Sequence, residues 1–176
     1  MKMHFKLFAG ILVTALFCSA FSLPKNIQKK VKKEINKTFK TETFTLNPLV
    51  FESSDLVVSD FSQNRFFEVL QDQKLIGYAY VGNAPSKTDT FEYLVLFNAN
   101  LIIQKAKVLV YREDYGGEIG SKRWLRQFEG KSVETSFLLQ QNIAAISGAT
   151  ISVTSMTRAI NVLNQSLYQL RLQQKI

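Results

Sequence analysis

The clearest periodic pattern near the start of the chain is a row of apolar residues spaced by four positions. The row contains Ile27, Val31, Ile35 and Phe39. Steps of four place these side chains on one face of a helix, and the positions between them are mostly polar. The pattern predicts an amphipathic helix over residues 25–39. It should pack on the rest of the domain, because one narrow apolar stripe cannot hold an isolated helix.

The middle of the chain changes to the short apolar runs that are typical of strands. The predicted strands cover residues 66–71, 74–81, 91–97 and 101–112. The polar pair Asp72-Gln73 between the first two predicts a β-hairpin. Together these runs predict an antiparallel meander of about four strands, and the absence of long helical crossovers disfavours a doubly wound parallel sheet.

Turn-forming residues surround these strands. Residues 42–46 alternate loosely between apolar and polar positions, which indicates a further short strand. Pro48 and the Ser53-Ser54-Asp55 cluster predict loops. Residues 82–89 contain glycine, asparagine and proline, and are predicted to form a loop as well.

The last segment predicts a long helix. Its apolar positions recur in steps of three and four, at Val153, Met156, Ile160, Leu163, Leu167 and Leu170. This spacing predicts an amphipathic helix over residues 152–170 that docks on the sheet. Earlier in the chain, Ser121 is placed to cap a short helix over residues 122–128. The predicted fold class is therefore α+β, an antiparallel sheet meander packed with an N-terminal and a long C-terminal helix.

The first 22 residues have the pattern of a targeting segment. Two lysines precede an apolar run over residues 7–17, and small residues follow it. This order is typical of a secretory signal peptide, and the run is short for a membrane span. We therefore predict a signal peptide over residues 1–22, a basic amphipathic helix over 23–41 and one domain over 42–176. The protein should be exported, periplasmic or on the outer face of the cytoplasmic membrane, with the segment either cleaved or retained as an anchor.

Cleavage of this segment would remove two reactive residue types from the chain. The sequence has one histidine and one cysteine, His4 and Cys18. A cleaved chain would have no Ser-His-Asp or Cys-His pair, no disulfide and no histidine or cysteine metal ligand. Redox or group-transfer chemistry would then need a bound organic cofactor.

The net charge of +8 is concentrated in one place. Residues 25–40 hold seven lysines against one glutamate, whereas acidic and basic residues balance in the chain after residue 40. This patch is either a solvated helix face or a contact for an anionic membrane surface or an acidic partner. Because the excess is local and the chain is expected to be exported, no nucleic acid is expected as a partner.

A run of four small residues, Ser147-Gly148-Ala149-Thr150, directly precedes the C-terminal helical pattern. Free backbone N–H groups and the helix dipole make such a loop suitable for a phosphate. Gly148 and Ala149 would let a ligand approach the backbone, and Thr150 would place a hydroxyl beside the phosphate. The alternative is an ordinary loop whose serine or threonine hydroxyls cap the helix. On spacing alone, the alternative is the commoner case.

A second segment, residues 111–131, combines a strand end, a glycine-rich turn and the short helix. Its distinctive residues are Glu113, Gly116, Trp124, Leu125, Phe128, Gly130 and Lys131. Together with Ser147-Gly148-Ala149-Thr150, they resemble the two signatures of the FMN-binding domain family. That family includes the G subunit of Rnf-type electron-transfer complexes and the C subunit of the sodium-pumping NADH:quinone oxidoreductase. The resemblance covers roughly residues 65–165.

The resemblance implies that the chain carries FMN, with its phosphate esterified to Thr150 by a flavin transferase. The cofactor-binding residues that it implies are Ser147, Gly148, Ala149, Thr150, Ser152, Glu113, Gly116, Gly117 and Trp124. It implies no metal site and no acid–base catalyst. The protein would be an electron carrier more than an enzyme in its own right, with a membrane redox protein as a partner.

Several residues also have a structural interpretation. Glu113 is either a solvated charge at a strand end or a carboxylate that caps the glycine turn. Trp124 is either a core aromatic or a ring that stacks on the flavin. Ser147 and Ser152 either bond phosphate oxygens or only cap the helix. Arg158 either neutralises phosphate or faces solvent.

Several positions depart from the family pattern, among them Asp114, Tyr115, Gly117, Glu118 and Ser152, and the departure that bears most on flavin attachment is Ala144. The family usually has an aspartate three residues before the serine, and this chain has Ala144 there. The alternative interpretation is therefore a non-redox extracytoplasmic binding or interaction module of the same fold that has lost flavinylation.

Overall fold

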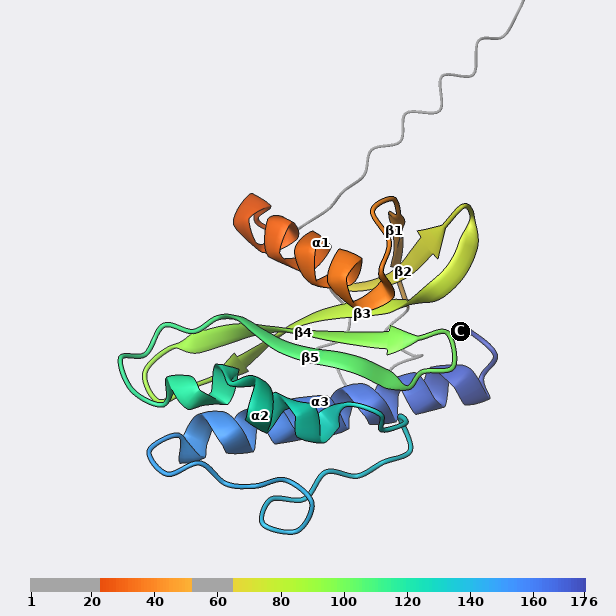
Figure 1. Ribbon diagram of the computed structural model, residues 1–176. Coiled ribbons are helices and arrows are strands. Elements are labelled where there is room, and N and C mark those ends of the chain that lie inside the picture. The colour runs from red at the N-terminus through yellow and green to blue at the C-terminus, as the bar shows by residue number, and fades with distance from the viewer. Residues whose placement is uncertain (1–22, 52–64) are drawn as a thin grey trace, which may run out of the picture.

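The computed structural model describes residues 23–51 and 65–176 (Figure 1). The predicted signal peptide and the predicted loop at Ser53-Ser54-Asp55 lie outside the described residues. The elements are α1 (Lys25–Phe39), β1 (Thr45–Leu49), β2 (Phe66–Gln71), β3 (Lys74–Pro85), β4 (Thr90–Asn98), β5 (Ile103–Val110), the 3-10 helix η3 (Gly117–Gly120), α2 (Lys122–Leu125), the 3-10 helix η4 (Arg126–Phe128) and α3 (Thr150–Leu172). The predicted α+β class is confirmed, with its antiparallel sheet and its N-terminal and long C-terminal helices.

Helix α1 forms where the four-residue apolar spacing predicts it. Ile27, Val31 and Ile35 are buried, and the lysines of the helix are exposed. The residue after the helix is Lys40, whose backbone is left-handed with a φ of 53° and whose N–H donates to the Asn36 carbonyl. Lys40 thus has the backbone conformation that glycine often adopts after a helix.

The five described strands form one antiparallel sheet in the order β1-β2-β3-β4-β5. The predicted hairpin at Asp72-Gln73 joins β2 to β3, and the two turn residues have φ values of 48° and 63°. Positive φ at both positions suits a two-residue hairpin, because the twist of such a turn matches that of the strands. Each strand therefore pairs with its neighbour along the chain.

Two predicted loops are strands in part, although residues 86–89 form a loop as predicted. Pro48 lies inside β1, which is an edge strand of the described sheet, where a missing N–H is tolerated. Residues 82–85 continue β3, because β4 pairs with it as far as Pro85 opposite Thr90. The longer β3 reaches α3, where the Ser155 hydroxyl donates to the Pro85 carbonyl.

The sheet separates two hydrophobic cores, so the described chain has three layers (Figure 1). On one face, the apolar stripe of α1 packs with Phe67, Ala79 and Leu94. On the other face, α2, η4 and α3 enclose a larger core that includes Phe97 and Phe128. Alternate residues of a strand point to opposite faces, which divides the apolar residues between the cores.

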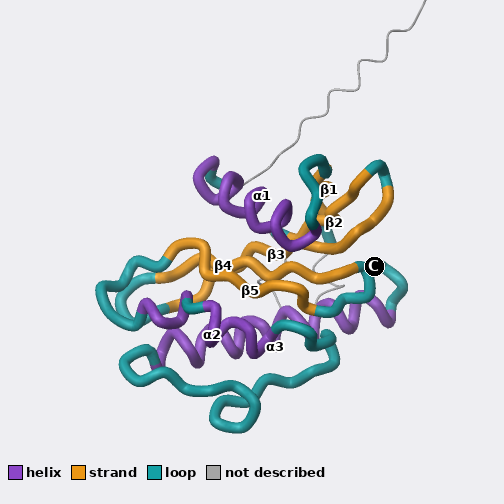
Figure 2. Tube along the Cα trace, viewed as in Figure 1, coloured by secondary structure: helices purple, strands orange, loops and turns teal. Residues whose placement is uncertain are grey.

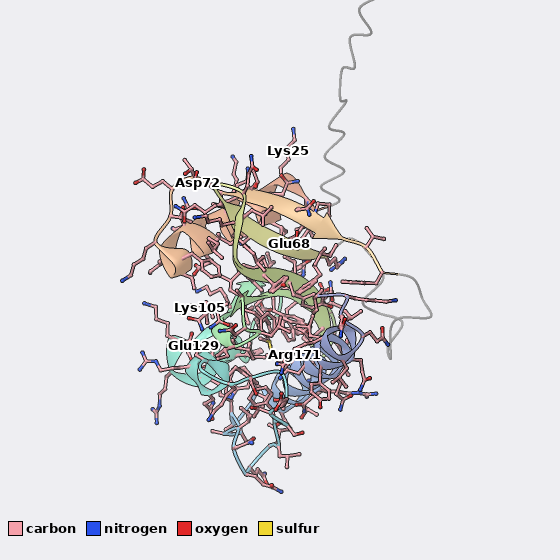
Figure 3. All side chains as sticks on the ribbon, turned by 90° about the vertical axis from the view of Figure 1, so that its right-hand side faces the viewer. Lys25, Glu68, Asp72, Lys105, Glu129 and Arg171 are labelled. Carbon is pink, nitrogen blue, oxygen red and sulfur yellow. The ribbon has the colours of Figure 1, made fainter. Side chains whose placement is uncertain are left out.

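A long connection without a helix joins η4 to α3 (Figure 2). Phe137 and Ile143 attach it to the larger core. The Asn161 side chain on α3 accepts a hydrogen bond from the Phe137 N–H at 2.8 Å and donates one to its carbonyl at 2.7 Å. An ion pair of 3.2 Å between Lys105 of β5 and Glu129 ties the start of the connection to the sheet (Figure 3).

The short helix and the last helix agree with the sequence pattern. Ser121 caps α2 as predicted, since its hydroxyl accepts from the Trp124 N–H at 3.3 Å. Helix α3 begins at Thr150, slightly before the predicted start, and so includes the last of the four small residues. Among the described residues, no helix combines the length and apolar character needed to cross a membrane.

Candidate functional site

The N-terminus of α3 is the first part of the candidate site. Thr150 is the first helical residue, Ala149 is the N-cap, and no side chain caps this end. The chain enters the helix through Gly148, whose φ of 80° is left-handed. Ser147, Gly148 and Thr150 are exposed. The first N–H groups of α3 therefore lack a side-chain partner, and the alternative of a helix capped by a serine or threonine hydroxyl is wrong.

The glycine turn after β5 lies against this helix end. Gly116 has a φ of 78°, and a Cβ there would lie 3.1 Å from the Ala149 Cβ. The Tyr111 hydroxyl is 3.0 Å from the Ser152 hydroxyl of α3 and donates to the Tyr115 carbonyl at 3.2 Å. The two segments singled out in the sequence are therefore in contact. Glycine suits residue 116 on two grounds, its backbone conformation and the closeness of Ala149.

Other residues of the two segments have different surroundings. Ser152 is 3% exposed, so its hydroxyl faces the glycine turn and not solvent. Gly117 is exposed, and a Cβ there would have no atom within 4 Å. The Tyr115 side chain is 84% exposed. Packing therefore does not require a glycine at residue 117. The role of Gly117 in cofactor binding stays a prediction.

Glu113 has contacts that the sequence does not predict. Its carboxylate accepts hydrogen bonds from the Ser86 hydroxyl and the Thr88 N–H, both at 2.7 Å. The Thr88 hydroxyl at 3.0 Å and the Asp89 N–H at 3.3 Å also donate to it. These donors, the Thr88 N–H first among them, lower the pKa of Glu113 to about 2. The carboxylate does not cap the glycine turn, as one interpretation predicted, but binds the β3–β4 loop while its side chain stays partly exposed.

Trp124 lies in the core. Its side chain is 4% exposed and meets the Phe128 ring edge-on, with the ring centroids 5.3 Å apart. The indole N–H donates to the Ala144 carbonyl at 2.7 Å, and the Ala144 N–H donates to the Gln127 side chain at 2.7 Å. This placement agrees with the core alternative for Trp124. It also fixes the backbone at the position where the family usually has an aspartate.

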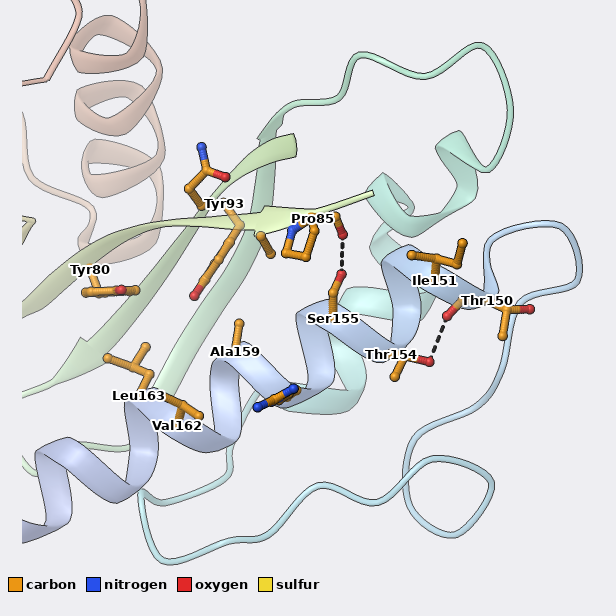
Figure 4. Close-up of a pocket in the computed structure, with 13 residues that line it drawn as sticks. Tyr80, Pro85, Tyr93, Thr150, Ile151, Thr154, Ser155, Ala159, Val162 and Leu163 are labelled. Atoms are coloured by element: carbon orange, nitrogen blue, oxygen red, sulfur yellow. Dashed lines mark hydrogen bonds between the residues drawn. The ribbon is translucent and has the colours of Figure 1, made fainter. Parts of the chain in front are cut away.

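A pocket of about 550 Å³ opens along α3 beside Thr150 (Figure 4). Tyr80, Tyr93 and the end of β3 line it on the sheet side, and α3 lines it from Thr150 to Leu163. On α3, the Thr150, Thr154 and Ser155 hydroxyls lie toward the start of the helix, and Ala159, Val162 and Leu163 line the pocket further along it. Among the described residues that line the pocket, Arg158 has the one charged side chain.

Reasoning from sequence missed the sheet side of this pocket. The sequence pattern assigns residues 82–85 to a loop and gives Tyr80 and Tyr93 no role beyond a strand. One signal was present in Gly82, since a Cβ there would lie 2.2 Å from the Tyr93 ring. A glycine inside an apolar strand often marks such a close approach.

The arrangement suits a ligand that joins a phosphate to a flat, mostly apolar ring system. The uncapped end of α3 and the exposed Thr150 hydroxyl suit the phosphate, and the adjoining pocket suits the ring. FMN has both parts, so the residues present fit it. The part of the chain that the structure describes has no group of three or more His, Cys, Asp or Glu side chains that would hold a metal ion.

Comparison with known proteins agrees with this fit. Residues 87–164 match the model of the FMN-binding domain, which confirms the resemblance drawn from the two signatures and indicates FMN as the cofactor. Among solved structures, NqrC of Shewanella oneidensis is similar, with a TM-score of 0.52 and 15% sequence identity over 80% of this chain and 99% of that chain. At this identity the likeness shows the fold. No match was found among the curated proteins.

Proposed function

Residues 87–164 match the FMN-binding domain, and from this premise we propose that the protein is an extracytoplasmic FMN-binding electron carrier. We further propose that the flavin is linked to Thr150 through a phosphoester. The observation that carries the proposal is the start of α3. An exposed threonine hydroxyl stands there at the first position of an uncapped helix, beside a pocket of about 550 Å³.

The end of α3 would hold the phosphate. A phosphate at a helix N-terminus meets N–H groups that have no partner within the helix and the positive end of the helix dipole. Ala149 is 4% exposed and packs against Gly116, which keeps the loop in position. Ser147 and Gly148 are exposed beside Thr150 and would be the other contacts of the phosphate.

The covalent link would be made by a flavin transferase that uses FAD and a divalent metal ion, as the family resemblance implies. The Thr150 Oγ would form a P–O bond to the phosphorus of the FMN half of FAD. It would displace AMP, which would leave with the electron pair of the P–O bond that joined it to this phosphorus. The hydroxyl proton is released, and no electron is gained or lost by the chain.

The flavin ring is proposed to occupy the pocket along α3. Bound flavin accepts and donates electrons one or two at a time, chemistry that this chain's own side chains do not supply. The chain would bind and orient the ring. Tyr80 and Tyr93 offer aromatic surfaces, and Ala159 and Val162 keep water from its faces. Arg158 would face negative charge on the phosphate or the reduced ring.

The proposed partners follow from electron transfer. A membrane redox protein would exchange electrons with the flavin, and the exposed lysines of α1 would contact an anionic membrane surface. These lysines lie on the layer of the domain opposite α3 (Figure 1), so a membrane contact there leaves the Thr150 site uncovered. Lys25, at the start of α1, extends away from the domain (Figure 3). A surface of this charge attracts anionic lipid headgroups.

Mass spectrometry of the chain co-expressed with a flavin transferase tests the covalent link. We expect a yellow protein and a Thr150 peptide that carries FMN. Thr150→Ala should abolish the covalent flavin and leave the far-UV circular dichroism unchanged. Thr154→Ala is the matched control, because Thr154 lies one turn further along the same helix and lines the same pocket. An unmodified Thr150 peptide from a colourless protein would contradict the proposal.

The second candidate function is a non-redox binding or interaction module of the same fold. Ala144 favours it, because its exposed side chain offers no carboxylate where the family usually has one. Flavin absorbance of the native chain separates the two candidates, and Ala144→Asp tests whether the missing carboxylate slows labelling. If the protein is a flavin carrier, the native chain is labelled and the aspartate speeds labelling. If it is the non-redox module, the native chain shows no flavin absorbance.

A further inference from the structure

Residues 111–113 contact segments that adjoin both sides of the pocket, Ser86 directly after Pro85 and Ser152 directly after Ile151, and we infer that Glu113 is a positioning residue for the cofactor. Its carboxylate holds the β3–β4 loop and, through that loop, the sheet side of the pocket. The inference rests on the proposed FMN site and adds a residue that acts without touching the flavin. We call residues 111–113 the brace.

The Glu113 carboxylate accepts hydrogen bonds from residues at both ends of the β3–β4 loop. Ser86 directly follows β3 and Asp89 directly precedes β4, and both donate to the same carboxylate oxygen as the Thr88 N–H. The Ser86 N–H donates to the Asp89 carbonyl at 2.8 Å, which closes the loop. Because backbone N–H groups converge on one carboxylate, removing it would leave them without their partner.

The loop is continuous with the sheet side of the pocket. Pro85, which directly precedes Ser86, lines the pocket together with Asn83 and Ala84. The Pro85 carbonyl accepts a hydrogen bond from the Ser155 hydroxyl on α3 (Figure 4). A shift of the loop would therefore move Pro85 and change the contact between the two sides of the pocket.

The other two side chains of the brace hold it in place. The Tyr111 hydroxyl contacts Ser152 near the start of α3, 3.0 Å away. The Arg112 guanidinium donates to the Glu92 carboxylate and to the Thr90 carbonyl, both at 2.8 Å. Three consecutive side chains thus reach α3, β4 and the β3–β4 loop. The brace joins the helix end that would carry the phosphate to the sheet side that would receive the ring.

The Glu113 carboxylate stays charged, and so keeps its hydrogen bonds to the β3–β4 loop, over a wide pH range. Hydrogen bonds from the loop lower the pKa of Glu113 to about 2, so mild acid leaves the carboxylate ionised and its four donors satisfied. The brace is therefore a constant feature of the site and not a switch.

Amide hydrogen exchange on the flavin-free full chain tests the contact with the loop. Glu113→Ala should speed exchange at Thr88 and Asp89 by about 10-fold or more, because their N–H groups lose an acceptor. Glu118→Ala is the matched control. Glu118 is an exposed glutamate in the same connection, and its side chain makes no hydrogen bond to the described residues. Glu113→Gln keeps one acceptor oxygen and should give an intermediate increase.

Circular dichroism of the flavin bands in the loaded chain tests the positioning role. We expect the bands to change in Glu113→Ala, to change less in Glu113→Gln and to stay the same in Glu118→Ala. Mass spectrometry of the Thr150 peptide reports loading separately. If Glu113→Ala fails to fold, Ser86→Ala and Thr88→Val remove donors one at a time, and the same two measurements apply.

Three results would overturn the inference. Unchanged exchange at Thr88 and Asp89 would show that the carboxylate does not hold the loop. Faster exchange with unchanged flavin bands in Glu113→Ala would show that Glu113 holds the loop but does not position the flavin. A native chain that binds no flavin would remove the positioning role together with the proposed function. The exchange data, collected without flavin, distinguish this last case from a failure of the brace.

Discussion

The two faces of the sheet are each covered by a helix, but the helices bury different kinds of residue. Helix α1 buries three residues, all apolar, and exposes its lysines. Helix α3 buries ten residues, of which four are polar. The polar ones are Ser152, Thr157, Asn164 and Ser166. Buried polar groups need hydrogen-bond partners. The packing of α3 on the sheet therefore depends on particular hydrogen-bond partners, whereas that of α1 depends on apolar contact.

The difference separates two uses of one sheet. On the α1 side, apolar packing fastens a charged surface to the domain. On the α3 side, hydroxyls, a glycine turn and a pocket meet at the start of the helix. The buried polar residues therefore indicate which face carries the candidate site, whereas the concentration of positive charge lies on the other face.

Truncation of a buried isoleucine on each face should have the largest effect. Ile160 of α3 and Ile35 of α1 are both 0% exposed. Each change to alanine should cost about 2–5 kcal/mol of the free energy of unfolding, measured in urea, because it leaves a cavity. We expect one transition in both variants and weaker flavin binding only in Ile160→Ala. Separate loss of α1 in Ile35→Ala would show that the two faces do not unfold together.

The glycines of β3 give the next largest contrast, because a side chain at each would disturb a different face. A Cβ at Gly77 would lie 2.2 Å from the Phe97 carbonyl and 2.7 Å from the ring of Phe39, the last residue of α1. A Cβ at Gly82 would lie 2.2 Å from the Tyr93 ring in the pocket. Each change to alanine should lower stability by about 1–3 kcal/mol in thermal unfolding. Only Gly82→Ala should alter the flavin spectrum, and an equal change in Gly77→Ala would contradict the division.

Lowering the pH should weaken the contact between Glu113 of the brace and the β3–β4 loop. The pKa of Glu113 is about 2 in the folded chain, below its ordinary value of 4.5. A lowered pKa contributes stability that is fully present above about pH 4.5 and is lost as pH falls toward 2. The stability difference between the native chain and Glu113→Gln should therefore shrink over this range in urea unfolding at a series of pH values. A difference that does not change with pH would contradict the assignment.

The lysines of α1 should have the smallest effect on stability. Replacing Lys29, Lys33 and Lys37 with glutamine should change the free energy of unfolding by no more than about 0.5 kcal/mol per site, because the side chains are exposed. The same variant should lose preference for vesicles that contain phosphatidylglycerol over neutral vesicles. Lys122→Gln, on α2 beside the opposite face, is the control. An unchanged preference would reduce the lysines to a solvated surface.

Local patterns in the sequence predicted the parts of the fold that depend on neighbouring residues. The apolar stripe of α1, the Asp72-Gln73 hairpin and the Ser121 cap are of this kind. Pro48 and residues 82–85 have the composition of loops, yet they are strands because distant partners pair with them. The composition of a segment indicates the conformation that the segment favours on its own. It does not indicate which distant strand will pair with it.

The candidate site shows the same limit. Thr150 and Gly116 were identified because the signatures are contiguous in the sequence. Tyr93 and the loop contacts of Glu113 were missed, because they bring together residues that lie far apart along the chain. A glutamate next to a glycine turn gives no sign that its acceptor oxygens serve a different loop.

The order of elements has a consequence for how the chain matures. Helix α1 is the first element described, yet it packs on Leu94 and Leu96 of β4, and the Lys30 ammonium donates to the Leu109 carbonyl of β5 at 2.7 Å. The helix therefore has no surface on which to bury its stripe until most of the sheet has been made. If the chain is exported from its N-terminus, as proposed, α1 would emerge before the sheet and would fold into place late. The six lysines of α1 would keep this segment soluble until the sheet is complete.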